Sequence, residues 1–131
     1  MNPPPSKVPP FPVDDALVDE AAGALDIAGR LEGHNGLLLL DVTTPHASIE
    51  PELAFVAAAV VGLHREIQDH DDLSDIEEAL EDPLKAEDQQ GIDEACDLYR
   101  RLLASRMKAL LRAPDGADRL IQLNAVGGRR P

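Results

Sequence analysis

The most regular hydrophobic pattern in the chain lies between residues 49 and 67. Apolar side chains recur there at alternating spacings of four and three residues, which places them on one face of an α-helix. The positions are Ile49, Leu53, Val56, Val60, Leu63 and Ile67. Ser48 suits the N-cap, and Pro51 is tolerated because the first helical turn needs no backbone donor. We therefore expect a central helix that its neighbours largely bury.

A second helical pattern precedes it, over residues 15–32. Asp14 is the expected N-cap, and leucines and alanines recur on one face at the same alternating spacing. Residues 33–36 (GHNG) form a turn signal that would end this helix. Because alanine dominates the stripe, the helix is expected to approach its neighbour closely.

Two further helices are expected after the central one. A short helix covers residues 73–81 and ends at Asp82-Pro83. A longer helix ends at about Arg112, before a Pro-Asp-Gly turn. This longer helix begins either at Pro83 or after Gly91, because a glycine weakens a helix interior.

The segment 37–43 (LLLLDVT) has the length and the turn-bounded ends of a buried strand. A strand cannot stand alone, so it needs a partner. Three arrangements stay open: pairing with 119–126 (RLIQLNAV), addition to the sheet of a neighbouring chain, or a short helix over 37–42.

These patterns predict a mainly α protein, a small bundle of three to four helices with room for one short two-stranded β ribbon. Residues 1–13 are expected to form an extended arm, because residues 2–12 contain six prolines. Residues 14–113 would form the helical core domain, and residues 114–131 a C-terminal extension with a basic end.

Composition limits the kind of core and the cellular location that we expect. Aromatic residues make up only 2% of the chain, so the core has to be aliphatic. A single cysteine, Cys96, excludes an internal disulfide and is expected to be a buried thiol. The first residues show no secretory signal, and the longest charge-free apolar run, 53–63, is too short to span a bilayer. We expect a soluble cytoplasmic protein, or a virion component if the chain comes from a phage.

The net charge of −13 is unevenly distributed. Residues 64–97 contain fourteen acidic and two basic side chains, whereas residues 98–131 contain eight basic and two acidic ones. An acidic surface of this kind repels nucleic acid and anionic membranes. Opposite charges at the two places could instead steer docking between copies or onto a partner.

Ionisable residues are dense over 64–72, but they do not form a recognisable reaction centre. Glu66 and His70 would share a helix face, as two metal ligands can, yet zinc requires three or four ligands. The sequence contains no glycine-rich phosphate loop and no activated nucleophile. We therefore expect no cofactor, no metal and no enzymatic activity.

The leading functional hypothesis is a non-enzymatic structural or accessory subunit of a larger protein assembly, such as a bacteriophage virion component or an accessory subunit of a bacterial complex. It is based on the two extended ends, the split charge and the strand-like segments. The alternative is an acidic inhibitor that imitates DNA and occupies a nucleic-acid-binding protein. A metal-dependent enzyme ranks third.

Partner contacts are expected at the arm, at the acidic middle and at the basic end. The candidate partner-binding residues are Phe11, Asp71, Asp72, Asp75, Glu77, Glu78, Arg119, Arg129 and Arg130. The expected partners are other protein subunits, in a homo- or hetero-oligomer. Nucleic acid would bind only through the basic tail, and no membrane contact is expected.

Overall fold

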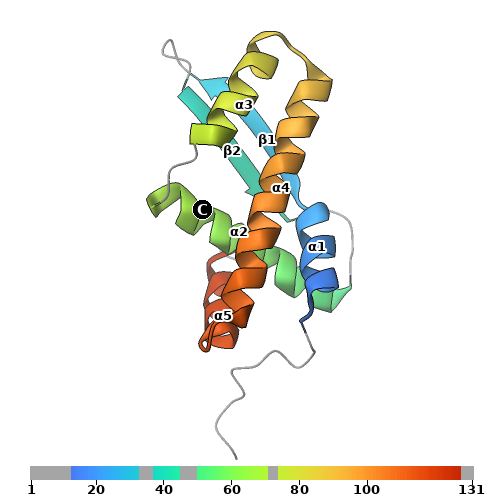
Figure 1. Cartoon of the computed structure of the whole chain (residues 1–131), viewed down its shortest axis with the longest axis vertical. Coiled ribbons are helices and arrows are strands. Elements are labelled where there is room, and N and C mark those ends of the chain that lie inside the picture. The colour runs from blue at the N-terminus through green and yellow to red at the C-terminus, as the bar shows by residue number, and fades with distance from the viewer. Residues whose placement is uncertain (1–12, 33–36, 45–49, 71–73, 128–131) are drawn as a thin grey trace, which may run out of the picture.

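The computed structural model describes residues 13–32, 37–44, 50–70 and 74–127, with the backbone alone described at 30–32, 37–40, 69–70 and 74–78. Its elements, in chain order, are α1 (Asp15–Gly23), β1 (Asp26–Glu32), β2 (Leu37–Thr43), α2 (Pro51–His70), α3 (Ser74–Lys85), α4 (Gln89–Arg112) and α5 (Gly116–Gly127). The fold is mainly helical with one two-stranded antiparallel sheet, as the sequence predicts (Figure 1). The described residues form five helices, against the three to four expected.

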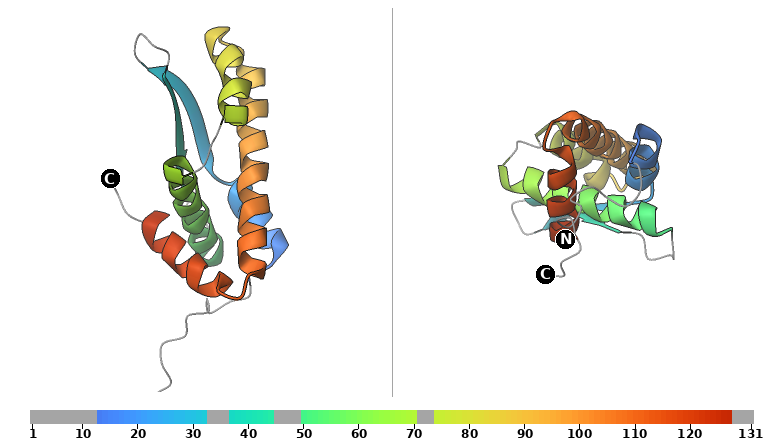
Figure 2. Two further views of the ribbon diagram at one scale, coloured as in Figure 1. Left: turned by 60° about the vertical axis from the view of Figure 1, so that its left-hand side comes forward. Right: turned by 90° about the horizontal axis from the view of Figure 1, so that it is seen from below.

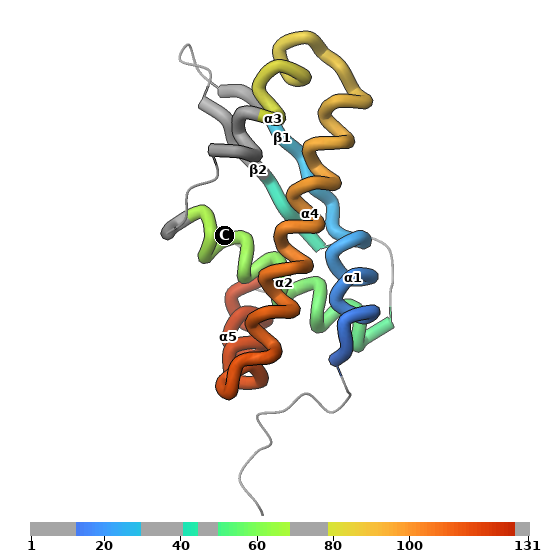
Figure 3. Tube along the Cα trace, in the orientation of Figure 1, coloured from blue at the N-terminus to red at the C-terminus, as the bar shows by residue number. Residues whose placement is uncertain are grey.

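The long helix α4 connects the two ends of the molecule (Figure 3). Its 24 residues span about 36 Å at the usual rise per residue. It packs against α3 and β1 at one end and against α1, α2 and α5 at the other. It buries Ala95 and Cys96 in its first half and Leu103 and Met107 in its second half, so one helix contributes to the core at both ends.

The central helix predicted by the hydrophobic period is confirmed as α2. Val56, Val60, Leu63 and Ile67 are all buried, and the helix packs against α1, α4 and α5. Residues 45–49, including the expected N-cap, lie outside the described residues. The core is aliphatic as expected, with Tyr99 as its largest fully buried side chain.

The helix expected over 15–32 is wrong in its second half. Asp14 caps α1 as predicted, since its Oδ1 accepts a hydrogen bond from the Leu17 N–H at 2.8 Å. The helix ends at Gly23, and residues 26–32 form β1, paired antiparallel with β2 in a register that places Ile27 opposite Val42. Only four residues separate the two strands, so both runs satisfy their backbone groups in one local ladder. That ladder outweighs the weak helical period of the alanines.

The segment 119–126 is helical, so pairing with 119–126, one of the three arrangements left open for 37–43, is wrong. It belongs to α5, which lies across α2 (Figure 2). Leu120 and Leu123 are three residues apart and both are buried, which is helical spacing. The Asn124 side-chain amide also donates to the backbone oxygen of Phe55 at 2.9 Å. Because β2 already has β1 as its partner, no second internal strand is required.

The backbones of α2 and α5 meet through two glycines. A Cβ atom added at Gly62 would overlap the carbonyl oxygen of Leu123, and one added at Gly127 would overlap the carbonyl oxygen of Ala58. Small residues on facing helices permit this close approach. The end of α5 is thereby held against the central helix.

The turn between α3 and α4 differs slightly from expectation. α3 continues through Pro83 to Lys85 instead of ending at Asp82-Pro83, because a proline in the last turn removes only one helical hydrogen bond. Glu87 then adopts a left-handed conformation with φ of 53°, and the Asp88 N–H bonds to the Pro83 oxygen at 2.8 Å. α4 begins at Gln89, between the two starts considered, and ends at Arg112 as predicted.

Candidate functional site

Exposed carboxylates gather where α3 turns into α4. Residues 79–97 contain seven acidic side chains and one lysine, and all eight are exposed. The acidic residues, called the acidic end below, are Glu81, Asp82, Glu87, Asp88, Asp93, Glu94 and Asp97. Lys85 pairs with Glu81 at 2.8 Å, and contact with this ammonium lowers the pKa of the exposed Glu81 carboxyl. Arg100 pairs in the same way with Asp97 at 2.7 Å, so these two cations offset two of the seven negative charges.

Basic side chains in the second half of α4 form ion pairs within the fold. Lys108 pairs with Asp19 at 2.7 Å, and Arg112 pairs with Asp15 at 3.2 Å. These two ion pairs join α4 to α1 along neighbouring turns. The charge split seen in the sequence therefore does not become two equivalent poles, since ion pairs with α1 neutralise part of the basic charge.

Arg119 is the candidate partner-binding residue whose side chain the structure describes. It donates to Glu66 at 2.5 Å and to Gln122 at 3.3 Å, and its side chain is 32% exposed. It therefore connects α5 to α2. The same contact occupies the carboxylate of Glu66, which the sequence had suggested as a metal ligand beside His70.

The structure describes no side chain of the remaining candidates. Five of them lie outside the described residues: Phe11, Asp71, Asp72, Arg129 and Arg130. Asp75, Glu77 and Glu78 belong to the first turns of α3, where the structure describes the backbone alone. The acidic end begins at Glu81 in the same helix, so these three positions precede it directly along the chain.

A buried polar pair joins α2 to α4. Nδ1 of His64 lies 2.6 Å from the Tyr99 hydroxyl, and the two rings meet edge to face at 77°. His64 is 3% exposed and Tyr99 is fully buried, and burial raises the pKa of the tyrosine hydroxyl. The sequence patterns did not point to this pair. The available signal was the position of His64, four residues after Val60 and three before Ile67, on the buried stripe.

Cys96 is buried, as predicted. Its thiol lies 3.7 Å from the backbone oxygen of Ile27 on β1. Desolvation raises the pKa of the thiol, so the unreactive protonated form is favoured. Cys96 therefore contributes to packing between α4 and β1.

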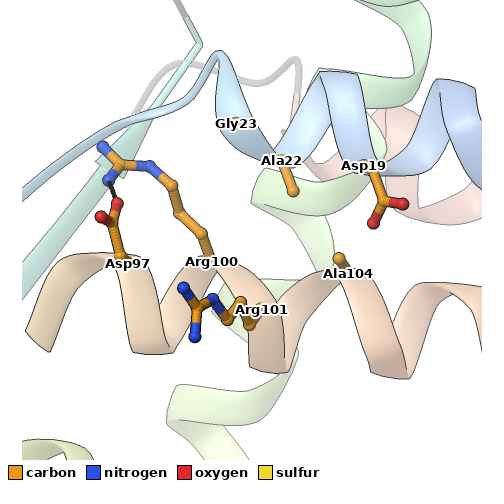
Figure 4. Close-up of a pocket in the computed structure, with 7 residues that line it drawn as sticks. All are labelled: Asp19, Ala22, Gly23, Asp97, Arg100, Arg101 and Ala104. Atoms are coloured by element: carbon orange, nitrogen blue, oxygen red, sulfur yellow. Dashed lines mark hydrogen bonds and ion pairs between the residues drawn. The ribbon is translucent and has the colours of Figure 1, made fainter. Parts of the chain in front are cut away.

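A shallow indentation lies between α1 and α4, with a volume of about 210 Å³. Its lining residues are Asp19, Ala22, Gly23, Asp97, Arg100, Arg101 and Ala104. Figure 4 shows the Arg100 guanidinium turned toward Asp97, to which it donates at 2.7 Å. A second donor of Arg100 reaches the Leu25 oxygen at 3.0 Å, whereas its buried Nε has no hydrogen-bond partner. The volume is below that of an ordinary ligand pocket.

Among the described residues, no three His, Cys, Asp or Glu side chains are grouped closely enough to hold a metal ion. None of the described helices has both the length and the apolarity needed to cross a membrane.

Comparison with protein-family models, with curated proteins and with solved structures gave no match.

Proposed function

We propose that the protein is a non-enzymatic structural or accessory subunit of a larger protein assembly, of the kind found in bacteriophage virions or in bacterial complexes. The acidic end carries this proposal. Its seven exposed carboxylates are accompanied by one lysine and one arginine, which pair with Glu81 and Asp97, so the acidic end keeps a net negative charge. Such a surface accelerates and orients association with a partner of opposite charge, and it acts more on specificity than on affinity.

The described polar contacts support a scaffold role. The His64–Tyr99 pair joins α2 to α4, and the Arg119–Glu66 pair joins α5 to α2. Arg65 also donates to the Val126 oxygen at 2.6 Å. Each of these contacts connects two elements, so the polar side chains hold α2, α4 and α5 together.

A charge-neutralisation experiment tests the proposal. One variant combines Asp82→Asn, Glu87→Gln and Glu94→Gln, which removes three charges from the acidic end. The matched control combines Asp26→Asn, Glu50→Gln and Glu52→Gln, which removes three exposed charges elsewhere. Tagged chains are purified from the native source, and the co-purifying proteins and native mass are determined. We expect partners to be lost from the first variant and kept by the control.

Truncation tests the contribution of the two ends. Deleting residues 1–12, or residues 128–131, should weaken assembly and leave the helical signal unchanged. The second deletion keeps Gly127, which packs against α2. An isolated monomer in native extracts, or equal partner recovery by all variants, would overturn the proposed role.

The acidic end also supports the second candidate, an inhibitor that imitates DNA. In that case the carboxylates of the acidic end would occupy the phosphate-binding surface of a nucleic-acid-binding protein. Binding should then fall steeply with salt, compete with DNA and survive both truncations. Partner binding that depends on the ends and ignores competing DNA excludes this candidate.

A further inference from the structure

The long helix α4 has one exposed face. The helix crosses in front of the sheet and α2 in Figure 1, and Figure 2 places it on the outside of the molecule. Side chains at helical spacings of four, four, three and four residues share this face, and all five are exposed. They are Gln90, Glu94, Leu98, Arg101 and Ser105.

A leucine lies at the middle of this face. Leu98 is 47% exposed, more than Val126, the other exposed large hydrophobic side chain in the described part of the chain. Single exposed leucines are ordinary on protein surfaces, so Leu98 alone does not define a docking site. The charges on either side of it are a second observation.

Opposite charges lie one helical turn before and one turn after Leu98. Glu94 is exposed and accepts a hydrogen bond from the neutral amide of Gln90 at 3.2 Å. Arg101 is exposed and forms no ion pair with any of the described residues, and Figure 4 shows that the neighbouring Asp97 is paired with Arg100 instead. Because Glu94 and Arg101 are two turns apart, they cannot pair with each other within one helix.

We propose that α4 packs antiparallel against α4 of a second copy of this chain, across a two-fold axis beside Leu98. The axis brings the two copies of Leu98 together and places Glu94 of each chain opposite Arg101 of the other. A two-fold interface requires a patch that complements itself, and the order acid, leucine, base meets that requirement.

The order of the charges selects the antiparallel direction. Parallel packing would place Glu94 against Glu94 and Arg101 against Arg101, and like charges that face each other across an interface are unfavourable. Antiparallel packing also puts the two α3–α4 turns at opposite ends of the helix pair. Most of the carboxylates of the two acidic ends are then kept apart.

Charge reversal in the purified full chain tests this pairing, which does not rest on the proposed function. The unmodified chain should sediment at twice the 14.1 kDa of one chain. Glu94→Arg and Arg101→Glu each place like charges opposite one another, so each variant alone should sediment as a monomer. An equal mixture of the two variants should form a dimer again, because both contacts then join opposite charges. Glu52→Arg makes the same charge change at an exposed position on α2 and should leave the dimer intact.

Cross-linking tests the position of the axis. Leu98→Cys should be bridged between two chains by a short bis-maleimide, whereas Asp88→Cys should not, because its two copies lie at opposite ends of the helix pair. The native Cys96 is buried and should not react.

Four results would overturn the pairing. They are a monomer of the unmodified chain at all concentrations, a dimer that both charge reversals leave intact, a mixture of the two variants that stays monomeric, and cross-linking at residue 88 in place of residue 98. The mass of the purified chain is measured separately from the recovery of native partners, so failure of this pairing and failure of the proposed function can be told apart.

Discussion

Nδ1 of His64 lies 2.6 Å from the hydroxyl of Tyr99, which places one hydrogen bond between α2 and α4 inside an otherwise aliphatic core. Tyr99→Phe removes a single oxygen and leaves His64 buried with one hydrogen bond fewer. We expect the free energy of unfolding to fall by about 1–3 kcal/mol, the usual cost of leaving a buried polar group short of a partner. Urea unfolding measures the change.

A double-mutant cycle with His64→Leu is the control for this exchange. If the two side chains interact as the geometry indicates, their combined effect should differ from the sum of the single effects by more than about 0.5 kcal/mol. Additive effects would show that the two side chains do not interact.

Alkaline titration should report the burial of Tyr99 directly. Burial raises the pKa of its hydroxyl in the folded chain, whereas an unfolded tyrosine ionises near pH 10.0. The stability that Tyr99 supplies is therefore complete below about pH 10 and is lost as the pH rises toward the folded pKa. The chain has one tyrosine and no tryptophan, so tyrosinate absorbance arises from this residue alone.

The expected result is that tyrosinate forms together with unfolding, as followed by circular dichroism. Ionisation near pH 10 in a chain that keeps its helical signal would show that Tyr99 is accessible to solvent.

The close contact between α2 and α5 predicts that alanine is tolerated poorly at Gly62 and Gly127, in contrast to a glycine outside the contact. Gly62→Ala and Gly127→Ala each place a methyl group against facing backbone, so each should destabilise the fold by about 1–3 kcal/mol. Gly23→Ala is the matched control, because nothing lies within 4 Å of the added carbon at the end of α1. It should be neutral or stabilising by up to about 1 kcal/mol. Equal effects at all three positions would contradict the close approach of the helices.

Glu87 offers a stabilising exchange. Its φ of 53° lies in the left-handed region that disfavours residues with a Cβ atom. Glu87→Gly should raise the free energy of unfolding by about 0.5–1 kcal/mol, in thermal or urea unfolding. Glu87→Ala removes the same charge but keeps the Cβ atom, so it should give no comparable gain. If both variants gain equally, relief of charge repulsion rather than backbone conformation is the cause.

Local signals in the sequence were enough to predict several features of the structure. The period of Val56, Val60, Leu63 and Ile67 is carried by strong apolar side chains, so the buried face of α2 could be predicted. The cap at Asp14 is also local, because it depends on a side chain and an amide three residues apart. The acidic end could be anticipated from charge density along 64–97.

The failures concern contacts between elements, which the pattern of one segment does not contain. Residues 26–32 have a weak helical period, and only pairing with 37–43 makes them a strand. Residues 119–126 look like a strand in isolation, but the glycines at 62 and 127 let them pack on α2 as a helix. The His64–Tyr99 pair spans 35 residues, so no local pattern contains both partners.

One long helix shared by both ends of the molecule has a consequence for cooperativity. The sheet and α3 cover the first half of α4, and α1, α2 and α5 pack on the rest. Removing either group of elements would expose apolar side chains of α4 to water. We therefore expect heat to melt the hairpin and the helices in a single transition, with no half-molecule that survives alone.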